Sequence, residues 1–269
     1  EHFCAAIRNM GNGKLNRIEM QDRRMTREVM NVVDNYNEMA DRMNEYLSRE
    51  LVYERNQRII QSKMLKYQIN PHFLYNTLNT IASMGELSDF PEIVTIAKNL
   101  SYIMQYNLRG SSFVSLASEI EMVKSYIEIQ QIRFPDTFAV QYDIAEDVKE
   151  LQIIKFILQP IVENALYHGI KNKRGMGHIQ IDGRMAGDNI EFIVSDNGIG
   201  MREEEAEHLR NVISGLISDD RSDGGFGLFN VNQRLELNYG KEYGLNIEST
   251  YNVGTTIRVK IPAVKKQTL

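Results

Sequence analysis

The stretch QINPHFLYNTLNTI, residues 68–81, places a proline directly before a histidine inside a predicted helix. A proline within a helix removes one backbone donor and clashes with the preceding turn, so a bend is expected at Pro71. The bend would expose one side of the His72 imidazole. On this stretch alone, a reactive exposed histidine and an ordinary surface histidine beside a kink are equally good interpretations.

A heptad pattern precedes this stretch. Its apolar positions alternate in steps of three and four residues and are Met25, Val29, Val32, Tyr36, Met39, Met43 and Tyr46. This spacing is typical of the a/d seam of a coiled coil. Continued in register, the frame meets polar Glu50 and Gln57 at a positions and places His72 at a b position, beside the seam. The pattern favours self-association, and the alternative is a long amphipathic helix packed within one chain.

The composition is that of an ordinary soluble protein large enough for two domains. Of the 269 residues, 42% are hydrophobic and 25% are charged, and the formal net charge is -5. The acidic balance argues against a general nucleic-acid binder. Cys4 is the single cysteine, which excludes an intrachain disulfide and a cysteine-based metal cluster. The sequence starts at Glu1 rather than Met, in helix-like sequence, and we expect it to be a fragment of a longer protein.

The predicted secondary structure changes near residues 134–137. Before this point strand signals are nearly absent, and helices are predicted at 91–109 and 116–133. After it, alternating apolar residues predict strands at 138–144, 178–185, 189–196, 245–250 and 255–262, with helices at 153–170 and 226–239. The fold expected is an all-helical half followed by an α+β half.

DNGIGM, residues 196–201, follows one of the predicted strands. An aspartate at a strand end, followed by two closely spaced glycines, gives a tight turn whose backbone can approach a flat ligand. The Asp196 carboxylate could accept a hydrogen bond from an exocyclic amine such as that of adenine. The alternative is a simple turn, since Asp-Asn-Gly is common turn chemistry.

Two further motifs carry candidate chemistry. GGFGL, residues 224–228, leads into a helix whose N-terminal N–H groups suit phosphate, although on this motif alone a flexible loop is the better interpretation. VENALYHG, residues 162–169, places Asn164 and His168 on one helix face. An amide oxygen suits Mg²⁺ that also contacts phosphates. Glu163 as a locally paired helix carboxylate, and His168 as an ordinary residue near the end of the helix, are the alternatives.

Order and spacing join these motifs. Asn164, Asp196 and Gly227 are separated by 32 and 31 residues. The polar stretch 202–223 between the last two is typical of a mobile lid over a ligand. Gly254 and Thr255 at the start of the last strand complete the set.

With these motifs together, the second half resembles the ATP-binding domain shared by gyrase-like ATPases, Hsp90 and histidine kinases. VENALYHG is similar to the N box, DNGIGM to the first glycine box and GGFGL to the second. PHFLYN resembles the phosphoacceptor motif of one subfamily of bacterial sensor histidine kinases, and residues 1–50 resemble part of a HAMP signalling module.

The resemblance implies a role for each matching residue. His72 would accept the γ-phosphoryl group. Glu163 would polarise the attacking group or help to deprotonate it. Phe73 stands where many histidine kinases have an acidic base, and Asn76, one turn later, is the residue that could orient the imidazole or a water. The residues implied in binding ATP and Mg²⁺ are Asn164, which would also be the metal ligand, Asp196, Gly198, Gly200, Gly225, Gly227 and Thr255. His168, Lys171 and Lys173 are weaker candidates for phosphate contact.

The resemblance also implies an organisation. Residues 1–50 would be HAMP-like, 51–134 would form a dimeric four-helix bundle with the phosphoacceptor, and 135–269 would be an α+β sandwich that binds ATP, a mixed sheet covered by helices on one face. The expected partners are a second copy of the chain and the receiver domain of a response regulator, without nucleic acid. The expected location is the cytoplasmic side of a bacterial membrane, anchored through an upstream segment. An ATPase of the same fold and a non-catalytic signalling scaffold are the rival functions.

Overall fold

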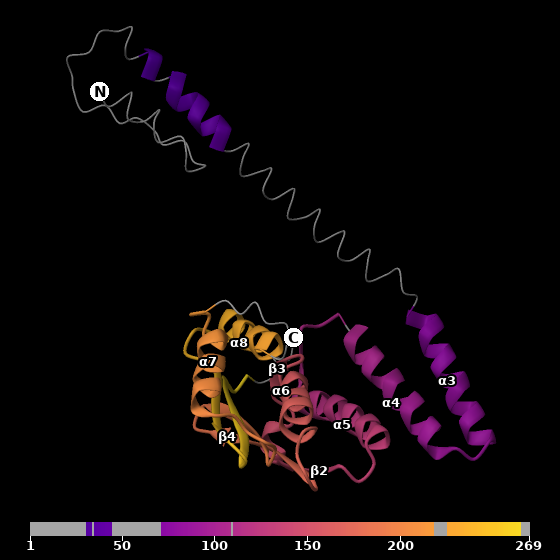
Figure 1. Cartoon of the computed structure of the whole chain (residues 1–269). Coiled ribbons are helices and arrows are strands. Elements are labelled where there is room, and N and C mark those ends of the chain that lie inside the picture. Colours follow the sequence, from indigo (N-terminus) through magenta and orange to yellow (C-terminus); the bar gives the residue numbers. More distant parts are fainter. Residues whose placement is uncertain (1–30, 34, 45–70, 109, 218–224, 265–269) are drawn as a thin grey trace. The chain divides into compact units, whose positions relative to one another are not determined.

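The computed structural model describes residues 31–33, 35–44, 71–108, 110–217 and 225–264 (Figure 1). The chain divides into two units, Glu1–Asn70 and Pro71–Leu269. Each is described by itself.

In the first unit, residues 31–33 and 35–44 are helical. Among the predicted seam residues there, Tyr36 is buried, whereas Val32, Met39 and Met43 each expose about half of their surface, at 54%, 53% and 47%. The other seam residues, Glu50 and Gln57, and the residues before Pro71 on which the predicted bend depends, lie outside the described residues. Coiled-coil pairing and the bend stay predictions.

The second unit begins with two packed helices, α3 (Pro71–Leu87) and α4 (Pro91–Leu108). Backbone hydrogen bonds from Ser88 to Met84 (3.0 Å) and from Phe90 to Gly85 (2.9 Å) end α3. Gly85 is buried, and a methyl group there would lie 3.0 Å from Cγ2 of Val94. The glycine therefore lets the two helices approach closely beside their turn.

Helix α5 (Leu116–Arg133) follows the short strand β1 (Phe113–Ser115). The hydroxyl of Ser115 caps α5 by accepting the Ser118 N–H at 3.3 Å. The buried residues of α5, including Ile120 and Ile127, belong to the same hydrophobic core as the strands that follow. α5, predicted as part of the helical half, thus packs against the α+β half.

A five-stranded mixed sheet forms the centre of the α+β half. Its order is β2-β4-β5-β7-β6, with β2 and β4 parallel and the other neighbours antiparallel. The strands are β2 (Phe138–Ile144), β4 (Gly177–Ala186), β5 (Asn189–Asp196), β6 (Gly244–Thr250) and β7 (Gly254–Pro262). The predicted helical half and the mixed-sheet half that follows it are confirmed.

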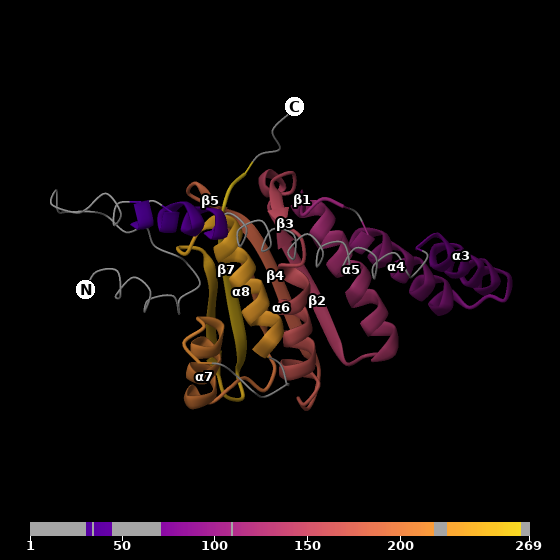
Figure 2. The same ribbon diagram turned by 90° about the horizontal axis from the view of Figure 1, so that it is seen from above.

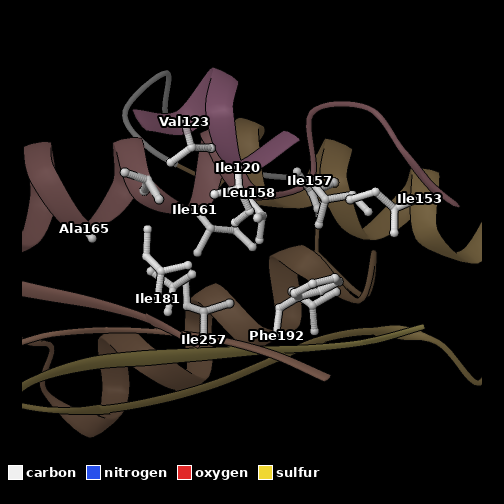
Figure 3. Close-up of a cluster of buried hydrophobic side chains, with 14 of the residues drawn as sticks. Ile120, Val123, Ile153, Ile157, Leu158, Ile161, Ala165, Ile181, Phe192 and Ile257 are labelled. Carbon is white, nitrogen blue, oxygen red and sulfur yellow. The ribbon is translucent and has the colours of Figure 1, made fainter. Parts of the chain in front are cut away.

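Helices cover one face of this sheet, where α6 (Leu158–Asn164), the π-helical turn η3 (Ala165–Ile170) and α8 (Gly225–Tyr239) lie beside α5 (Figure 2). Alternate strand residues such as Ile181, Phe192 and Ile257 are buried beneath them, as the two-residue period of a strand requires. Figure 3 shows these side chains meeting Leu158 and Ile161 of α6. One apolar core therefore fixes α5 and α6 on the sheet.

The predicted helix at 153–170 was wrong at its start. Residues Gln152–Ile154 form β3, which pairs with β1, and α6 begins only at Leu158. Pro160 explains the late start, because proline is tolerated in the first turn of a helix but not in its interior. The buried β-branched pair Ile153 and Ile154 suits a strand.

Part of the predicted lid, 202–223, is helical, which the sequence pattern did not predict, and the lid role itself stays a prediction. Residues Glu203–Ile213 form α7, in which Ala206, Val212 and Ile213 are buried. Three glutamates in the first turn suit the N-terminal end of the helix dipole, and the Glu205 carboxylate accepts the Arg202 N–H at 2.8 Å. Residues 218–224 lie outside the described part of the chain. The short helix η2 (Glu146–Val148) was also not predicted.

Candidate functional site

Asp196 ends β5 on the face covered by helices. It continues the alternation of buried Ile190, Phe192 and Val194, so its side chain points toward η3. There it lies so close that a methyl group on Gly169 would be 2.6 Å from its Oδ1. Burial raises the pKa of the Asp196 carboxyl to about 6, against the lowering effect of hydrogen bonds from two backbone N–H groups and of the Lys173 charge.

The glycines after Asp196 allow a close backbone crossing. The Gly198 N–H donates to Asp196 Oδ1 at 2.8 Å, and the Ile199 N–H donates to the Gly169 carbonyl at 2.9 Å. A Cβ on Gly198 would lie under 3.0 Å from backbone atoms of Gly169. Gly200 has a φ of 60°, and a Cβ there would meet the Thr250 carbonyl. Side chains are excluded from both positions.

Thr255 anchors this loop from β7. It is buried and stands opposite Asp196 in the register of β5 and β7. Its hydroxyl is 2.9 Å from that of Ser249, which in turn accepts the Met201 N–H at 2.9 Å. Thr255 therefore pairs with the strand that carries Asp196 and is linked through Ser249 to Met201 at the end of the DNGIGM loop. Ser249 is a supporting residue that the sequence did not reveal.

Glu163 and Asn164 lie at the C-terminal end of α6, where both are half-buried. Glu163 Oε1 accepts a hydrogen bond from Gln159 Nε2 at 2.9 Å, one turn earlier. Burial and then the charge of Glu163 raise the pKa of the Tyr126 phenol on α5. Glu163 therefore has a partner on its own helix, as expected if it is a locally paired helix carboxylate.

The basic candidates follow on η3 and beyond. His168 and Lys171 are exposed, and the Lys171 ammonium lies 5.7 Å from the centre of the Tyr167 ring. Lys173 is half-buried and donates a hydrogen bond to the carbonyl of Asn197 in the DNGIGM loop. Lys173 is thus tied to the loop, whereas His168 and Lys171 are available to a ligand.

The second glycine motif opens α8. Gly225 is the first described residue of that helix, and Gly227, two residues later in the first turn, is exposed. A Cβ on Gly227 would lie 3.8 Å from Cβ of Pro160, in ordinary contact with α6. The start of α8 therefore lies beside the helix that carries Glu163 and Asn164.

His72 and Asn76 stand apart, on α3. Both are exposed, and the Asn76 amide nitrogen lies 3.3 Å from Nδ1 and 3.5 Å from Nε2 of His72. In Figures 1 and 2, α4 and α5 lie between α3 and the sheet. The structure thus brings His72 and Asn76 together, but on a different surface from the glycine loops.

Four predicted residues, Asp196, Gly198, Gly200 and Thr255, meet at one place with the unpredicted Gly169. Two backbone N–H groups occupy part of the hydrogen-bonding capacity of the Asp196 carboxylate. An ionised carboxylate has about four acceptor sites, so capacity remains for an external amine. Bare glycine backbone beside that carboxylate suits a flat heterocycle. Gly169 directly follows His168 in VENALYHG. Its place in that motif was the one feature of the sequence that could have indicated its part in the site.

Two family models match this chain. Residues 60–138 match the model described as histidine kinase, and residues 152–265 match the model described as histidine kinase-, DNA gyrase B-, and HSP90-like ATPase. The first region holds His72 and Asn76, and the second holds the whole cluster around Asp196.

Two curated relatives match most of this chain. The chain is 34% identical over 233 residues to the sensor protein kinase HptS of Staphylococcus aureus, covering 86% of this chain and 44% of that protein. It is 34% identical over 202 residues to the sensor protein LytS of Bacillus cereus, covering 74% of this chain and 33% of that protein. The chain belongs to the sensor histidine kinases, and it spans less than half the length of either relative.

Two solved structures of histidine kinases are similar to this chain. The histidine kinase domain of a blue-light activated histidine kinase from Erythrobacter litoralis has a TM-score of 0.44 and 15% identity, covering 72% of this chain and 94% of that one. The catalytic domain of histidine kinase ThkA has a TM-score of 0.43 and 15% identity, covering 57% and 97%. Among the described helices of this chain, none combines the length and apolarity needed to cross a membrane.

Proposed function

We propose that this chain is the signalling part of a two-component sensor, an ATP-dependent protein-histidine kinase that phosphorylates His72 and passes the phosphoryl group to an aspartate of a response regulator. The observation that carries the proposal is an exposed imidazole on a helix of the histidine kinase region, in the same chain as the Asp196 and glycine cluster of the ATPase region. An acceptor and a donor site on one polypeptide fit phosphorylation within the protein or its dimer.

The proposed assembly is a homodimer whose four-helix bundle is built from α3 and α4 of two copies. Apolar side chains exposed on these helices support it: Phe73, Met84 and Leu87 on α3 are 65%, 62% and 89% exposed. The proposed domains are a HAMP-like segment at 1–50, the phosphoacceptor helices at 51–134 and the ATP-binding domain at 135–269. The parent protein is proposed to reside in a bacterial membrane, with this part on the cytoplasmic side.

ATP is proposed to bind with its adenine against Asp196, Gly198 and Thr255. The ionised carboxylate would accept the adenine amino group, and the crossing of Gly198 over Gly169 leaves no side chain in the way. Gly200 shapes the loop below. Gly225 and Gly227 at the start of α8, with His168 and Lys171, are proposed to face the phosphates.

The residues present suit Mg²⁺ through the amide oxygen of half-buried Asn164. When bound, the cation would supply charge neutralisation at the transferring phosphate. Glu163, next to Asn164, is proposed to polarise or help deprotonate the attacking group.

In the transfer step, the lone pair of one His72 ring nitrogen attacks the γ-phosphorus, the bond to the β,γ-bridging oxygen breaks, and ADP leaves. The imidazole proton is then released to a base or to water. Asn76 is proposed to select the nucleophile. In the structure the Asn76 amide nitrogen lies 3.3 Å from Nδ1; in the flipped amide, the oxygen would take this place, accept Nδ1–H and leave Nε2 unprotonated.

Incubation with γ-labelled ATP tests the proposal against its rivals. Acid-labile label on the protein is expected for the kinase. Free phosphate alone would indicate an ATPase, and neither product would indicate a scaffold.

The affinity for adenosine is expected to depend on pH through Asp196. The ionised carboxylate accepts the adenine amine more strongly than the protonated carboxyl does, and the pKa of this group in the free protein is raised to about 6. Affinity should therefore be highest above this pH and fall below it, by up to about tenfold between pH 7.5 and pH 5. Adenosine carries no phosphate to titrate, which makes calorimetry interpretable. In Asp196→Asn, affinity should be lower and flat over this range, and an unchanged pH profile in that variant would contradict the adenine assignment.

Asn164→Ala is expected to slow phosphorylation more than it weakens binding of nucleotide without metal. Partners that merely orient metal ligands already contribute 10–100-fold, so losing the proposed ligand should lower the Mg²⁺-dependent rate by roughly that much or more. Adenosine affinity should change less than about twofold, because the adenine contacts remain. Asn172→Ala, at an exposed position just beyond η3, is the matched control. Equal rates in both variants would remove Asn164 from the metal site.

A further inference from the structure

A fully buried carboxylate on α5 holds the start of α6. Glu119 is 0% exposed and accepts hydrogen bonds from the N–H groups of Phe156 (3.0 Å), Ile157 (2.9 Å) and Leu158 (3.1 Å). The residue at the N-cap position of α6 is Ile157, whose side chain cannot cap. Glu119 on α5 therefore binds the N–H groups of the two residues that lead into α6 and of Leu158, the first residue of the helix.

The same carboxylate reaches α4. The hydroxyl of Tyr106, which is 1% exposed near the end of α4, donates to Glu119 Oε2. The Tyr106 ring stands edge-on to that of Phe156, with centroids 5.5 Å apart. Buried Lys155 donates to the Tyr106 carbonyl at 2.9 Å. One buried carboxylate thus joins the end of α4 to the start of α6.

The backbone entering α6 is constrained on its other side as well. Phe156 has a φ of 58°, a left-handed conformation that is unfavourable for an aromatic residue. Arg234 of α8 donates to the carbonyls of Lys155 and Phe156. Contacts from three helices, α4, α5 and α8, therefore hold the turn in one position, and replacing a carboxyl oxygen of Glu119 by an N–H donor would loosen it.

A helix is stiff along its axis, so the position of its first turn sets the position of its last. Leu158 and Asn164 are six residues apart on α6, about 9 Å along the axis. We propose that Glu119 is a positioning residue that places Glu163 and Asn164 through α6 and couples them to α4 through Tyr106. This inference rests on the proposed function and adds a route by which a change in the phosphoacceptor helices reaches the metal end of the ATP site.

Glu119→Gln tests the positioning role, with Glu121→Gln as the matched control. Glu121 is two residues further on α5, exposed, and paired with Lys124 at 2.8 Å. In Glu119→Gln the amide group places an N–H against the backbone donors. At saturating ATP and Mg²⁺, the phosphorylation rate is expected to fall about tenfold. The gain in ATP affinity on adding Mg²⁺ is expected to shrink about fivefold, while adenosine affinity stays within about twofold. Glu121→Gln should match the wild type.

Tyr106→Phe tests the coupling to α4. It removes one hydroxyl and leaves the three N–H bonds of Glu119 in place. We expect a rate about threefold lower with unchanged adenosine affinity. The double variant Tyr106→Phe/Glu119→Gln should be no slower than Glu119→Gln alone, because both changes break the same connection. Tyr142→Phe, at a half-buried tyrosine of β2, is the control for losing a tyrosine hydroxyl.

Three results would overturn the inference. The first is a wild-type phosphorylation rate and a wild-type Mg²⁺ response in Glu119→Gln. The second is an equal loss of adenosine affinity and Mg²⁺·ATP affinity together with a lower unfolding temperature, which would mean that Glu119 only stabilises the fold. If Glu119→Gln does not fold, Tyr106→Phe decides, and a wild-type rate there overturns the coupling. A wild-type chain without acid-labile phosphate would refute the proposed function instead, and the Mg²⁺ response of nucleotide binding would still test Glu119.

Discussion

His72→Gln is expected to abolish the acid-labile phosphate on the protein while ATP affinity stays at the wild-type value. Glutamine has a similar length but no nucleophilic nitrogen, so no N–P bond can form. ATP affinity should persist because His72 is exposed on α3, whereas the proposed adenine contacts lie on η3, β5 and β7. The measurements are label incorporation from γ-labelled ATP and calorimetry with the same preparation.

His208→Gln is the control, since His208 is exposed on α7 within the ATPase region. It should incorporate label at the wild-type rate. Acid-labile label retained in His72→Gln would mean that another histidine accepts the phosphoryl group. A large loss of ATP affinity in His72→Gln would instead mean that His72 acts within the nucleotide site.

The spacing of apolar residues predicted most elements of the α+β half, because each strand of its sheet buries one face against the core. The β5 segment NIEFIVSD alternates apolar and polar residues, and the structure buries Ile190, Phe192 and Val194 on one face. The prediction failed at 153–170, where an apolar run of strand and helix has no period that separates them. Pro160 was the signal that should have moved the helix start. The helix α7 was not predicted, because its few buried residues are surrounded by charge.

The local motifs predicted the part of the site that local backbone chemistry builds. Asp196 and Gly198 meet each other within one turn, and Thr255 meets Asp196 through strand pairing. The proposed functions of these residues stay predictions, as do those of Glu163, His168 and Lys171. Gly169 was missed because its contact with Gly198 depends on how η3 lies on the sheet, which no local pattern encodes.

Glu119 shows most clearly what cannot be predicted from the sequence alone. In the sequence SEIEMVK, Glu119 and Glu121 look alike, and both would be placed on a solvated helix face. The structure buries one completely and exposes the other. The partners of Glu119 are backbone groups 37 to 39 residues away, so only the folded arrangement of α5 on α6 distinguishes the two glutamates.

Gly198→Ala is expected to remove measurable ATP binding at concentrations that saturate the wild type. The added methyl group would lie under 3.0 Å from the Cα, carbonyl carbon and oxygen of Gly169, and backbone atoms cannot rotate away as a side chain would. The loop must therefore move from η3, which breaks the 2.9 Å bond from Ile199 to Gly169 and displaces Asp196 from its partner. Overpacking of this kind costs about 1–3 kcal/mol, which should lower the unfolding temperature by roughly 5 °C.

Gly110→Ala separates this steric effect from the general effect of losing a glycine. A Cβ at Gly110 meets nothing within 4 Å, so this variant should bind ATP and unfold as the wild type does. Calorimetry gives the affinities and a thermal scan gives the unfolding temperatures. The expected loss in Gly198→Ala is more than about a hundredfold in affinity, because the adenine hydrogen bond and the loop geometry are lost together. Wild-type affinity in Gly198→Ala would show that ATP does not use the crossing of the DNGIGM loop over η3, and the adenine site would have to lie elsewhere.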